Sequence, residues 1–281
     1  MSFDHLVRLF RVQHWTLPML VTTFLAYPRM DFLMALILPI VFCQQAFLFA
    51  SNDYFDRDID AKDPDKKDRN IISSGIFSLG KARLLLALLV ALPAILSSLI
   101  GSTPFAVNAA WLVLAALYTA PPVRFKKRVG FDLLVHGVTV LSFPFVFTMV
   151  ASNSFTTRNI AISAILVLVS IFAQLLQEFR DYKTDSLVER NSVIAMGLET
   201  SYVALTATLV AALALSSFLV MTHKISALFS IVSALCVCWI YDVLRTWRSG
   251  DLTRVNVNTF GHILRKTALC LVPVVFFWIV T

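Results

Sequence analysis

Three aspartates stand at helical spacing between residues 51 and 60. Asp53, Asp56 and Asp60 are three and four residues apart, which places them on one face of a helix, with Asn52 beside them. Like charges at this spacing destabilise a helix unless a cation lies among them, and anions are unfavourable near a helix C-terminus. Carboxylate and amide oxygens are the ligands that Mg²⁺ prefers. The first acidic row (residues 52, 53, 56 and 60) therefore predicts a magnesium site, with Mn²⁺ as the alternative ion.

A second acidic row repeats this spacing later in the chain. Glu178, Asp181 and Asp185 follow the same i, i+3, i+7 pattern, with Arg180 and Lys183 between them. A single charged run is most often a solvated loop, but two rows of equal spacing, each at the end of an apolar stretch, favour binding over solvation. We expect the two rows to face each other across a cavity, because Mg²⁺ held by few carboxylates completes its shell with substrate phosphate oxygens.

Basic side chains form two further groups. Residues 124–128 hold four cations, and a smaller group that ends at Arg69 follows the first acidic row. Taken alone, such groups indicate membrane topology. Beside two acidic rows, Arg124 and Lys126 acquire a second use, because Lys and Arg engage phosphate oxygens that a metal leaves free. Tyr118, just before this segment, is expected at the membrane–water boundary.

The elements that carry these residues are apolar helices. Of 281 residues, 58% are hydrophobic and 15% charged, with a mean hydropathy of +0.78, against roughly 45–50% and about 25% in soluble domains. These figures exclude a soluble globular protein and a disordered chain. They predict one all-α integral membrane domain over residues 1–281, with nine transmembrane helices around a central cavity. The nine stretches are 13–29, 31–50, 82–101, 104–120, 131–151, 159–177, 200–221, 224–244 and 264–281.

The charges lie almost entirely at one end of these predicted spans. With a cytoplasmic N-terminus, 21 of the 24 Lys and Arg fall on the cytoplasmic side, as do 16 of the 17 Asp and Glu. This asymmetry predicts a multi-pass protein whose site opens to the cytoplasm. The net charge of +7 is therefore gathered in loops, and we expect no nucleic-acid partner. Metals and cations at a membrane cavity suit a ligand with a polyphosphate head and an apolar tail, such as a prenyl diphosphate.

These motifs resemble those of the UbiA superfamily of intramembrane prenyltransferases. The first acidic row matches every position of the family's Asn-Asp-x-x-Asp-x-x-x-Asp motif. Arg180, Asp181 and Asp185 match its second motif, although the small Gly common before the last Asp is missing. The family's Tyr-x-x-Pro-Pro-x-Arg-x-Lys segment is similar to residues 118–126, and its early Arg and Trp resemble Arg11 and Trp15. The nine-span layout extends the likeness over essentially the whole chain. Residues 63–67 also resemble a short segment of lycopene elongases.

The resemblance implies Mg²⁺-dependent transfer of a prenyl group from a prenyl diphosphate donor to a hydrophobic acceptor among the membrane lipids. The acceptor would be an aromatic or quinone precursor, a carotenoid or another lipid. Asp181, Asp185 or the released diphosphate would take the acceptor's proton. The implied catalytic and metal-binding residues are Asp53, Asp56, Asp60, Asp181 and Asp185, with Asn52 as a further ligand. The implied substrate-binding residues are Arg11, Asn52, Arg69, Tyr118, Arg124, Lys126, Arg180 and Lys183.

Two other functions remain open from the sequence. A terpene cyclase of the same family would use the same metals, but its carbocation would attack its own chain. A transporter is disfavoured, because the predicted spans contain almost no charge at their centres. Asp132 stands at the edge of a predicted span, and topology alone explains it.

Overall fold

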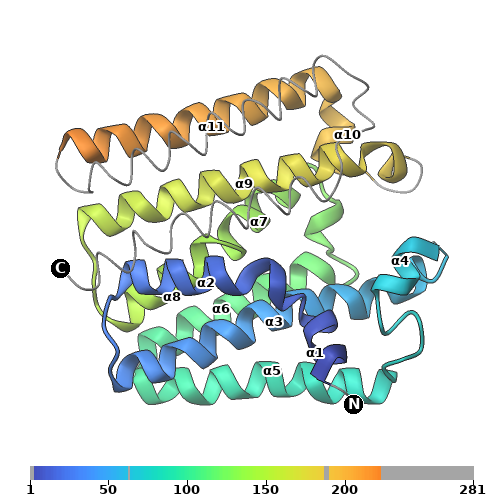
Figure 1. Cartoon of the computed structure of the whole chain (residues 1–281), viewed down its shortest axis with the longest axis horizontal. Helices are drawn as coiled ribbons and strands as arrows, with labels where there is room; N and C mark the ends of the chain where they lie inside the picture. The colour runs from blue at the N-terminus through green and yellow to red at the C-terminus, as the bar shows by residue number, and fades with distance from the viewer. Residues whose placement is uncertain (1–2, 63, 187–189, 223–281) are drawn as a thin grey trace.

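A computed structural model describes residues 3–62, 64–186 and 190–222 of the protein (Figure 1). The predicted spans 224–244 and 264–281 lie outside the described residues. Every described element is helical, which confirms the all-α class. In chain order the helices are α1 (Phe3–Phe10), α2 (Val12–Ala26), α3 (Phe32–Asp60), α4 (Pro64–Arg69), α5 (Leu79–Ile100), α6 (Ser102–Thr119), η1 (Phe125–Lys127), α7 (Phe131–Thr139), α8 (Ser142–Ala151), α9 (Thr157–Asp185), α10 (Ser192–Met196) and α11 (Leu198–Met221).

Five of these helices are long and apolar enough to cross a membrane, namely α3, α5, α6, α9 and α11. Helices α7 and α8 together would make a sixth span, bent by 47° at its break. The apolar part of α2, Trp15–Ala26, is shorter than a full crossing. The described residues thus support a multi-pass membrane protein with five or six of the nine predicted spans.

Helix α5 shows how the bundle meets its surroundings. Its large apolar residues on one side are exposed, at 45–68% of their full area: Leu84, Leu88, Leu92, Ile95 and Leu99. Their separations of three and four residues make a continuous stripe along the helix. An exposed apolar stripe of this length is typical of a helix face that meets lipid in a membrane protein.

The stretch 131–151, predicted as one continuous helix, is broken between α7 and α8. Pro144 has no N–H to donate to the carbonyl of Val140, and its ring disfavours a straight helix through that turn. Neighbouring side chains satisfy the exposed backbone. Gln45 Nε2 donates to the carbonyls of Thr139 (3.3 Å) and Val140 (3.2 Å), and Leu141 N donates to Ser170 Oγ (3.2 Å). A break inside a membrane is tolerated when protein groups complete its hydrogen bonds.

The two long helices that carry the acidic rows end on the same side of the bundle. In Figure 1, α3 and α9 both run toward the side where α4 and α10 lie. Helix α3 packs mainly against α5, α9 against α11 and α7, and α2 against α8. The arrangement therefore brings the polar residues of distant segments to one end of an apolar bundle.

Candidate active site

The first acidic row lies on the last turns of α3. The helix does not stop where the apolar stretch ends but continues to Asp60, so the row is rigidly attached to a membrane span. Asp53 is fully buried and Asp56 is largely buried, with 14% of its side chain exposed. Asp58, which lies off the predicted face, has 81% of its side chain exposed. Burial thus separates the aspartates of the motif from their neighbour.

Three cations from two distant segments contact the first acidic row. Arg11 donates to Asp53 Oδ1 over 2.6 Å. Arg124 contacts Asp56 Oδ1, and Lys126 contacts Asp56 Oδ2 and also donates to Asn52 Oδ1 over 2.8 Å. These contacts reduce the repulsion between like charges in the row, because Asp53 and Asp56 each have a cationic partner. The sequence shows basic and acidic groups on separate loops, and the structure joins them.

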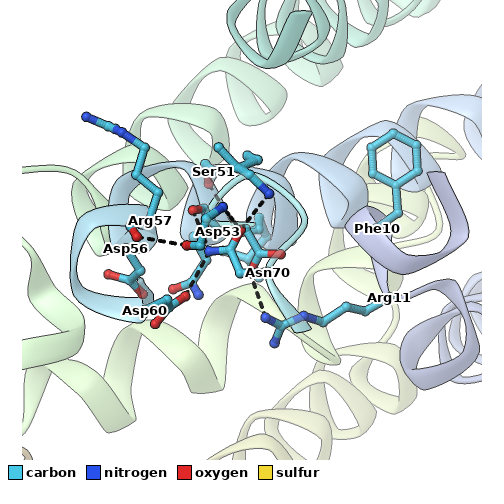
Figure 2. A network of polar contacts seen from close by, with 12 residues as sticks. Phe10, Arg11, Ser51, Asp53, Asp56, Arg57, Asp60 and Asn70 are labelled. Carbon is cyan, nitrogen blue, oxygen red and sulfur yellow. Dashed lines mark hydrogen bonds and ion pairs between the residues drawn. The ribbon is translucent and has the colours of Figure 1, made fainter. Parts of the chain in front are cut away.

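Both arginines at the row have a left-handed backbone. Arg11, between α1 and α2, has φ 51°, and Arg124, just before η1, has φ 44°. Asn153 is the other non-glycine residue with positive φ in the described part of the chain. Such a conformation is costly for a residue with a side chain, and it clusters at functional sites. Figure 2 shows the Arg11 side chain extending from this turn toward Asp53.

Aromatic residues lie beside the Arg11 guanidinium. Its guanidinium lies 6.0 Å from the centre of the Phe49 ring, one turn before Asp53 on α3. Trp15 stacks on Phe49, with the two ring centres 6.3 Å apart and the ring planes nearly parallel. A cation beside an aromatic face is attracted by the ring quadrupole. The Arg and Trp that resemble the family's early residues are thus placed next to the row.

Asn70 is a site residue that the sequence did not single out. It is buried, and its Nδ2 donates to the Asp53 carbonyl and to Asp60 Oδ2, both over 2.8 Å (Figure 2). Its Oδ1 accepts from Ile72 N and Ser73 N. Asn70 therefore ties the loop after α4 to the row and orients Asp60. The only hint in the sequence of a buried role for Asn70 is its place directly before the apolar pair Ile71 and Ile72.

Tyr118 lies in α6 near the row. It is buried at 8% exposure rather than at an open boundary, and it packs against the main apolar core. The next residue, Thr119, donates to Ser51 Oγ over 3.4 Å, beside Asn52 in sequence. The end of α6 is therefore held against the segment that opens the row.

The second acidic row is positioned by the end of α9. Asp181 is half-buried there, and the side chains of Arg180, Lys183 and Asp185, like that of Arg69 in α4, lie outside what the structure describes. Glu178 is buried and accepts from Gln174 Nε2 (2.8 Å) and from Val193 N (3.1 Å). The direct facing of the two rows stays a prediction.

Asp132 has a larger role than the sequence suggested. It is fully buried and accepts hydrogen bonds from both the backbone N–H and the hydroxyl of Ser192. Topology alone does not account for a buried carboxylate, because burial without partners is costly and its partners here are specific. The prediction that Asp132 is only a marker of a span edge was wrong.

The first acidic row has the donor chemistry for Mg²⁺. No three carboxyl, thiol or imidazole groups in the described part of the chain are already gathered as a metal site. However, Asp53 Oδ2 is buried and has no hydrogen-bond partner. Asn52 and Asp56 lie on the same helix face, and Lys126 contacts Asn52 Oδ1 and Asp56 Oδ2 while Arg124 contacts Asp56 Oδ1. A buried unpaired carboxylate oxygen beside further oxygens is the environment that a hard cation satisfies.

Comparison with known families decides the classification. Residues 16–264 match the model of the UbiA prenyltransferase family. The chain belongs to the UbiA prenyltransferase family. The match covers both acidic rows and the basic segment, so the resemblance of the motifs is confirmed at the level of the family.

Solved structures of UbiA homologues share the fold. A UbiA homologue from Archaeoglobus fulgidus bound to GPP and Mg²⁺ has a TM-score of 0.78 at 19% identity, covering 98% of this chain and 99% of that one. An apo UbiA homologue from Aeropyrum pernix has a TM-score of 0.74 at 18% identity, covering 97% of each chain. At these identities the likeness concerns the fold.

Curated relatives match over a shorter region. A lycopene elongase/hydratase of Haloarcula japonica is 34% identical over 99 residues, which are 34% of this chain and 32% of that protein. A protein of the same description from Halobacterium salinarum is 35% identical over 99 residues, or 34% of each chain. The matched region thus spans about a third of these relatives.

Proposed function

We propose that this UbiA family member transfers a prenyl group from a prenyl diphosphate to a hydrophobic acceptor within the membrane, in a reaction that needs Mg²⁺. The observation that carries the proposal is the first acidic row itself. Buried carboxylates at the end of a membrane helix are surrounded by Arg11, Arg124 and Lys126. A site with both signs of charge at the end of an apolar bundle suits a diphosphate head and an apolar tail.

The residues divide into two roles in this proposal. Asn52, Asp53, Asp56 and Asp60 would hold the metal, together with Asp181 and Asp185 from α9. The ion, when bound, would neutralise the diphosphate and so assist its departure. Arg11, Arg124 and Lys126 would bind phosphate oxygens and stabilise the charge that develops on the leaving group. Arg69, Tyr118, Arg180 and Lys183 are proposed as further substrate contacts.

The surroundings of the row favour chemistry on an allylic cation. Trp15 and Phe49 place aromatic faces close to Arg11 and Asp53. Aromatic faces attract positive charge, and a water-poor site protects a carbocation from hydrolysis. The acceptor would then attack the cation and lose a proton to Asp181, Asp185 or the released diphosphate.

The relatives support this reading without fixing the acceptor. One UbiA homologue is described as bound to GPP and Mg²⁺ and another structure as bound to DMAPP and Mg²⁺. The curated relatives are lycopene elongase/hydratases. A carotenoid is therefore the first acceptor to test, followed by quinone precursors and other lipids.

The test is an incubation of the purified full-length protein with radiolabelled C10 to C20 prenyl diphosphates, Mg²⁺ and a panel of lipid acceptors. We expect a prenylated acceptor and released diphosphate. Activity should disappear in EDTA and return with Mg²⁺ or Mn²⁺. A cyclised hydrocarbon formed without acceptor would identify a terpene cyclase instead. Undiminished turnover in EDTA would refute the metal role, and no turnover of any diphosphate would refute the proposal.

We also propose that this end of the bundle faces the cytoplasm. Lys67 is exposed just after the first acidic row, and Arg29 is exposed between α2 and α3 at the other end of α3. In a background without native cysteines, Lys67→Cys should react with an impermeant thiol reagent only from the cytoplasmic side, and Arg29→Cys only from outside. Labelling of both positions from one side would contradict this orientation.

A further inference from the structure

A buried polar node joins three segments near the proposed active site. It consists of Gly130, Asp132, Glu178, Ser192 and Val193, and we call it the Asp132 node. Gly130 N donates to Ser192 Oγ over 2.7 Å, and the Ser192 hydroxyl donates in turn to Asp132 Oδ1. Ser192 N donates to Asp132 Oδ2 over 2.6 Å, and Val193 N to Glu178 Oε2 over 3.1 Å. Asp132, Glu178, Ser192 and Val193 are all buried.

The node accounts for the start of α10. The first N–H groups of a helix have no partner within the helix. In α10, those of Ser192 and Val193 go to Asp132 and Glu178, and that of Ile194 goes to the side chain of Asn191. The remaining oxygen of Glu178, Oε1, accepts from Gln174 Nε2 over 2.8 Å. Every polar group of the node is thus engaged by another protein group.

The node stands between the basic segment and the second acidic row. Asp132 N donates to the Arg128 carbonyl over 3.0 Å, and Phe125 and Phe131 stack with their rings 5.0 Å apart. The basic segment is therefore fixed to the start of α7. On the other side, Glu178 precedes Asp181 by one turn of α9. Contacts run from Asp56, through Arg124 and Lys126, to the node and on to α9.

We propose that Asp132 and Ser192 are positioning residues that hold the basic segment and the end of α9 at a fixed separation, so that both act on the same diphosphate. The inference rests on the proposed function. Its physical basis is that Asp132, which follows the basic segment, and Glu178, near the end of α9, both bind the first N–H groups of α10. This common partner fixes the distance between the basic segment and the end of α9. Because neither residue would touch the substrate, their loss should weaken binding of diphosphate with Mg²⁺ rather than abolish chemistry.

The test compares three single variants of the full-length protein. Ser192→Ala removes the hydroxyl that bridges Gly130 and Asp132, Ser192→Thr keeps a hydroxyl there, and Asp132→Asn keeps the shape while losing an acceptor oxygen. Ser216→Ala is the matched control, because Ser216 is a buried serine whose hydroxyl donates to the Ala212 carbonyl within its own helix, α11. For each we would measure calorimetric binding of inorganic diphosphate with Mg²⁺, KM and kcat for prenyl diphosphate, and the thermal midpoint.

We expect Ser192→Ala and Asp132→Asn to weaken diphosphate binding and raise KM by about tenfold, the lower end of the effect of removing an outer support of a metal site. In both, kcat should fall much less than KM rises. Ser192→Thr should restore most of the binding, and Ser216→Ala should match the wild type. Unchanged binding in folded Ser192→Ala and Asp132→Asn, or an equal fall in kcat without a change in KM, would overturn the inference.

The binding measurement separates this inference from the proposed function. If the wild type does not bind diphosphate with Mg²⁺, the proposed function fails. If the wild type binds and the node variants bind equally well, only the positioning role fails. If one node variant does not fold, the other carries the same test, because Asp132 and Ser192 are the two halves of one contact.

Discussion

At the end of α3, carboxylates contact side-chain cations, whereas near the end of α9 Glu178 accepts from the backbone N–H of Val193 and the side-chain amide of Gln174. The two rows have the same spacing in sequence, and both follow an apolar span. Asp53 and Asp56 are contacted by Arg11, Arg124 and Lys126, which come from segments far away in the chain. Glu178 accepts from Val193 N and from Gln174 Nε2, one turn earlier on its own helix.

The difference shows that spacing determines the face of a helix but not its partners. A carboxylate that contacts side-chain cations can bind a metal ion in their place, and the cations can then bind a phosphate. A carboxylate beside backbone N–H groups is fixed, because the donors cannot leave without unwinding a helix. The first acidic row is therefore suited to binding, and the start of the second is suited to support.

The largest expected effect is a loss of prenyl transfer on substitution of Asp53 or Asp56, but not of Asp58 on the same helix. Asp56→Asn and Asp53→Asn should each reduce the rate of prenyl transfer by at least about 100-fold, as when a major electrostatic stabiliser is lost. Asp58→Asn is the control, because its exposed side chain contacts only the neighbouring Arg57 among the ion pairs described. Initial rates at saturating Mg²⁺ provide the measurement. A rate for Asp58→Asn as low as that for Asp56→Asn would contradict the distinction between buried and exposed aspartates of α3.

A smaller effect is expected from the cations of the first row. Arg124→Gln and Lys126→Gln each lose a charge-assisted contact worth roughly 1.5–3 kcal/mol, or about 10- to 100-fold in kcat/KM. The Arg124 variant should be the more affected, because guanidinium binds phosphate in a bidentate way. Steady-state kinetics with saturating acceptor would measure the loss.

The same two variants test whether a metal ion can replace Arg124 and Lys126 at Asp56. Because Arg124 and Lys126 both contact Asp56, they compete with an ion for that carboxylate. Calorimetry should therefore show Mg²⁺ alone binding the variants at least as tightly as the wild type, while diphosphate binds more weakly. Weaker Mg²⁺ binding would show that these cations support the metal site rather than compete with it.

Asn70→Ala tests support of the first row by the loop after α4. Asn70 makes four hydrogen bonds, and leaving buried partners unsatisfied costs on the order of 1–3 kcal/mol. We expect a lower thermal midpoint and a rate reduced by less than in Asp56→Asn. Ser73→Ala is the control, since its hydroxyl makes one hydrogen bond among the described residues, to the Arg57 carbonyl. Equal midpoints for the two variants would argue against this role.

The smallest effect is expected at the start of α9, at the far end from the second row. Thr156 caps the helix by accepting from Asn159 N over 3.1 Å. Thr156→Ala should cost about 1 kcal/mol of stability and leave the rate of prenyl transfer unchanged. Denaturation and kinetics on one preparation would check both. A large fall in rate would mean that the two ends of α9 are coupled.

The sequence predicted the parts of the molecule that depend on local pattern. Apolar stretches of the right length gave α3, α5, α6, α9 and α11, and the i, i+3, i+7 spacing gave the face that carries Asp53 and Asp56. The contacts between distant segments could not be predicted from local pattern. Asn70 and Asp132 are unremarkable in sequence, because their significance comes from partners in other elements.

The same limit explains the missed break at residues 140–141. Hydropathy across 131–151 is continuous, so a single span was the natural prediction. Pro144 alone does not dictate a break, because membrane helices tolerate proline when neighbours complete the hydrogen bonds. Here Gln45 and Ser170, from two other helices, supply those bonds.

That break divides one apolar stretch into two halves whose main partners differ. Helix α7 packs against α9 and contains Asp132, whereas α8 packs against α2 and places Phe143 against Trp111 in the apolar interior. The 47° bend puts Asp132 and Phe143 on helix axes of different direction. One continuous apolar stretch of the sequence thereby serves both the charged end and the apolar interior of the bundle.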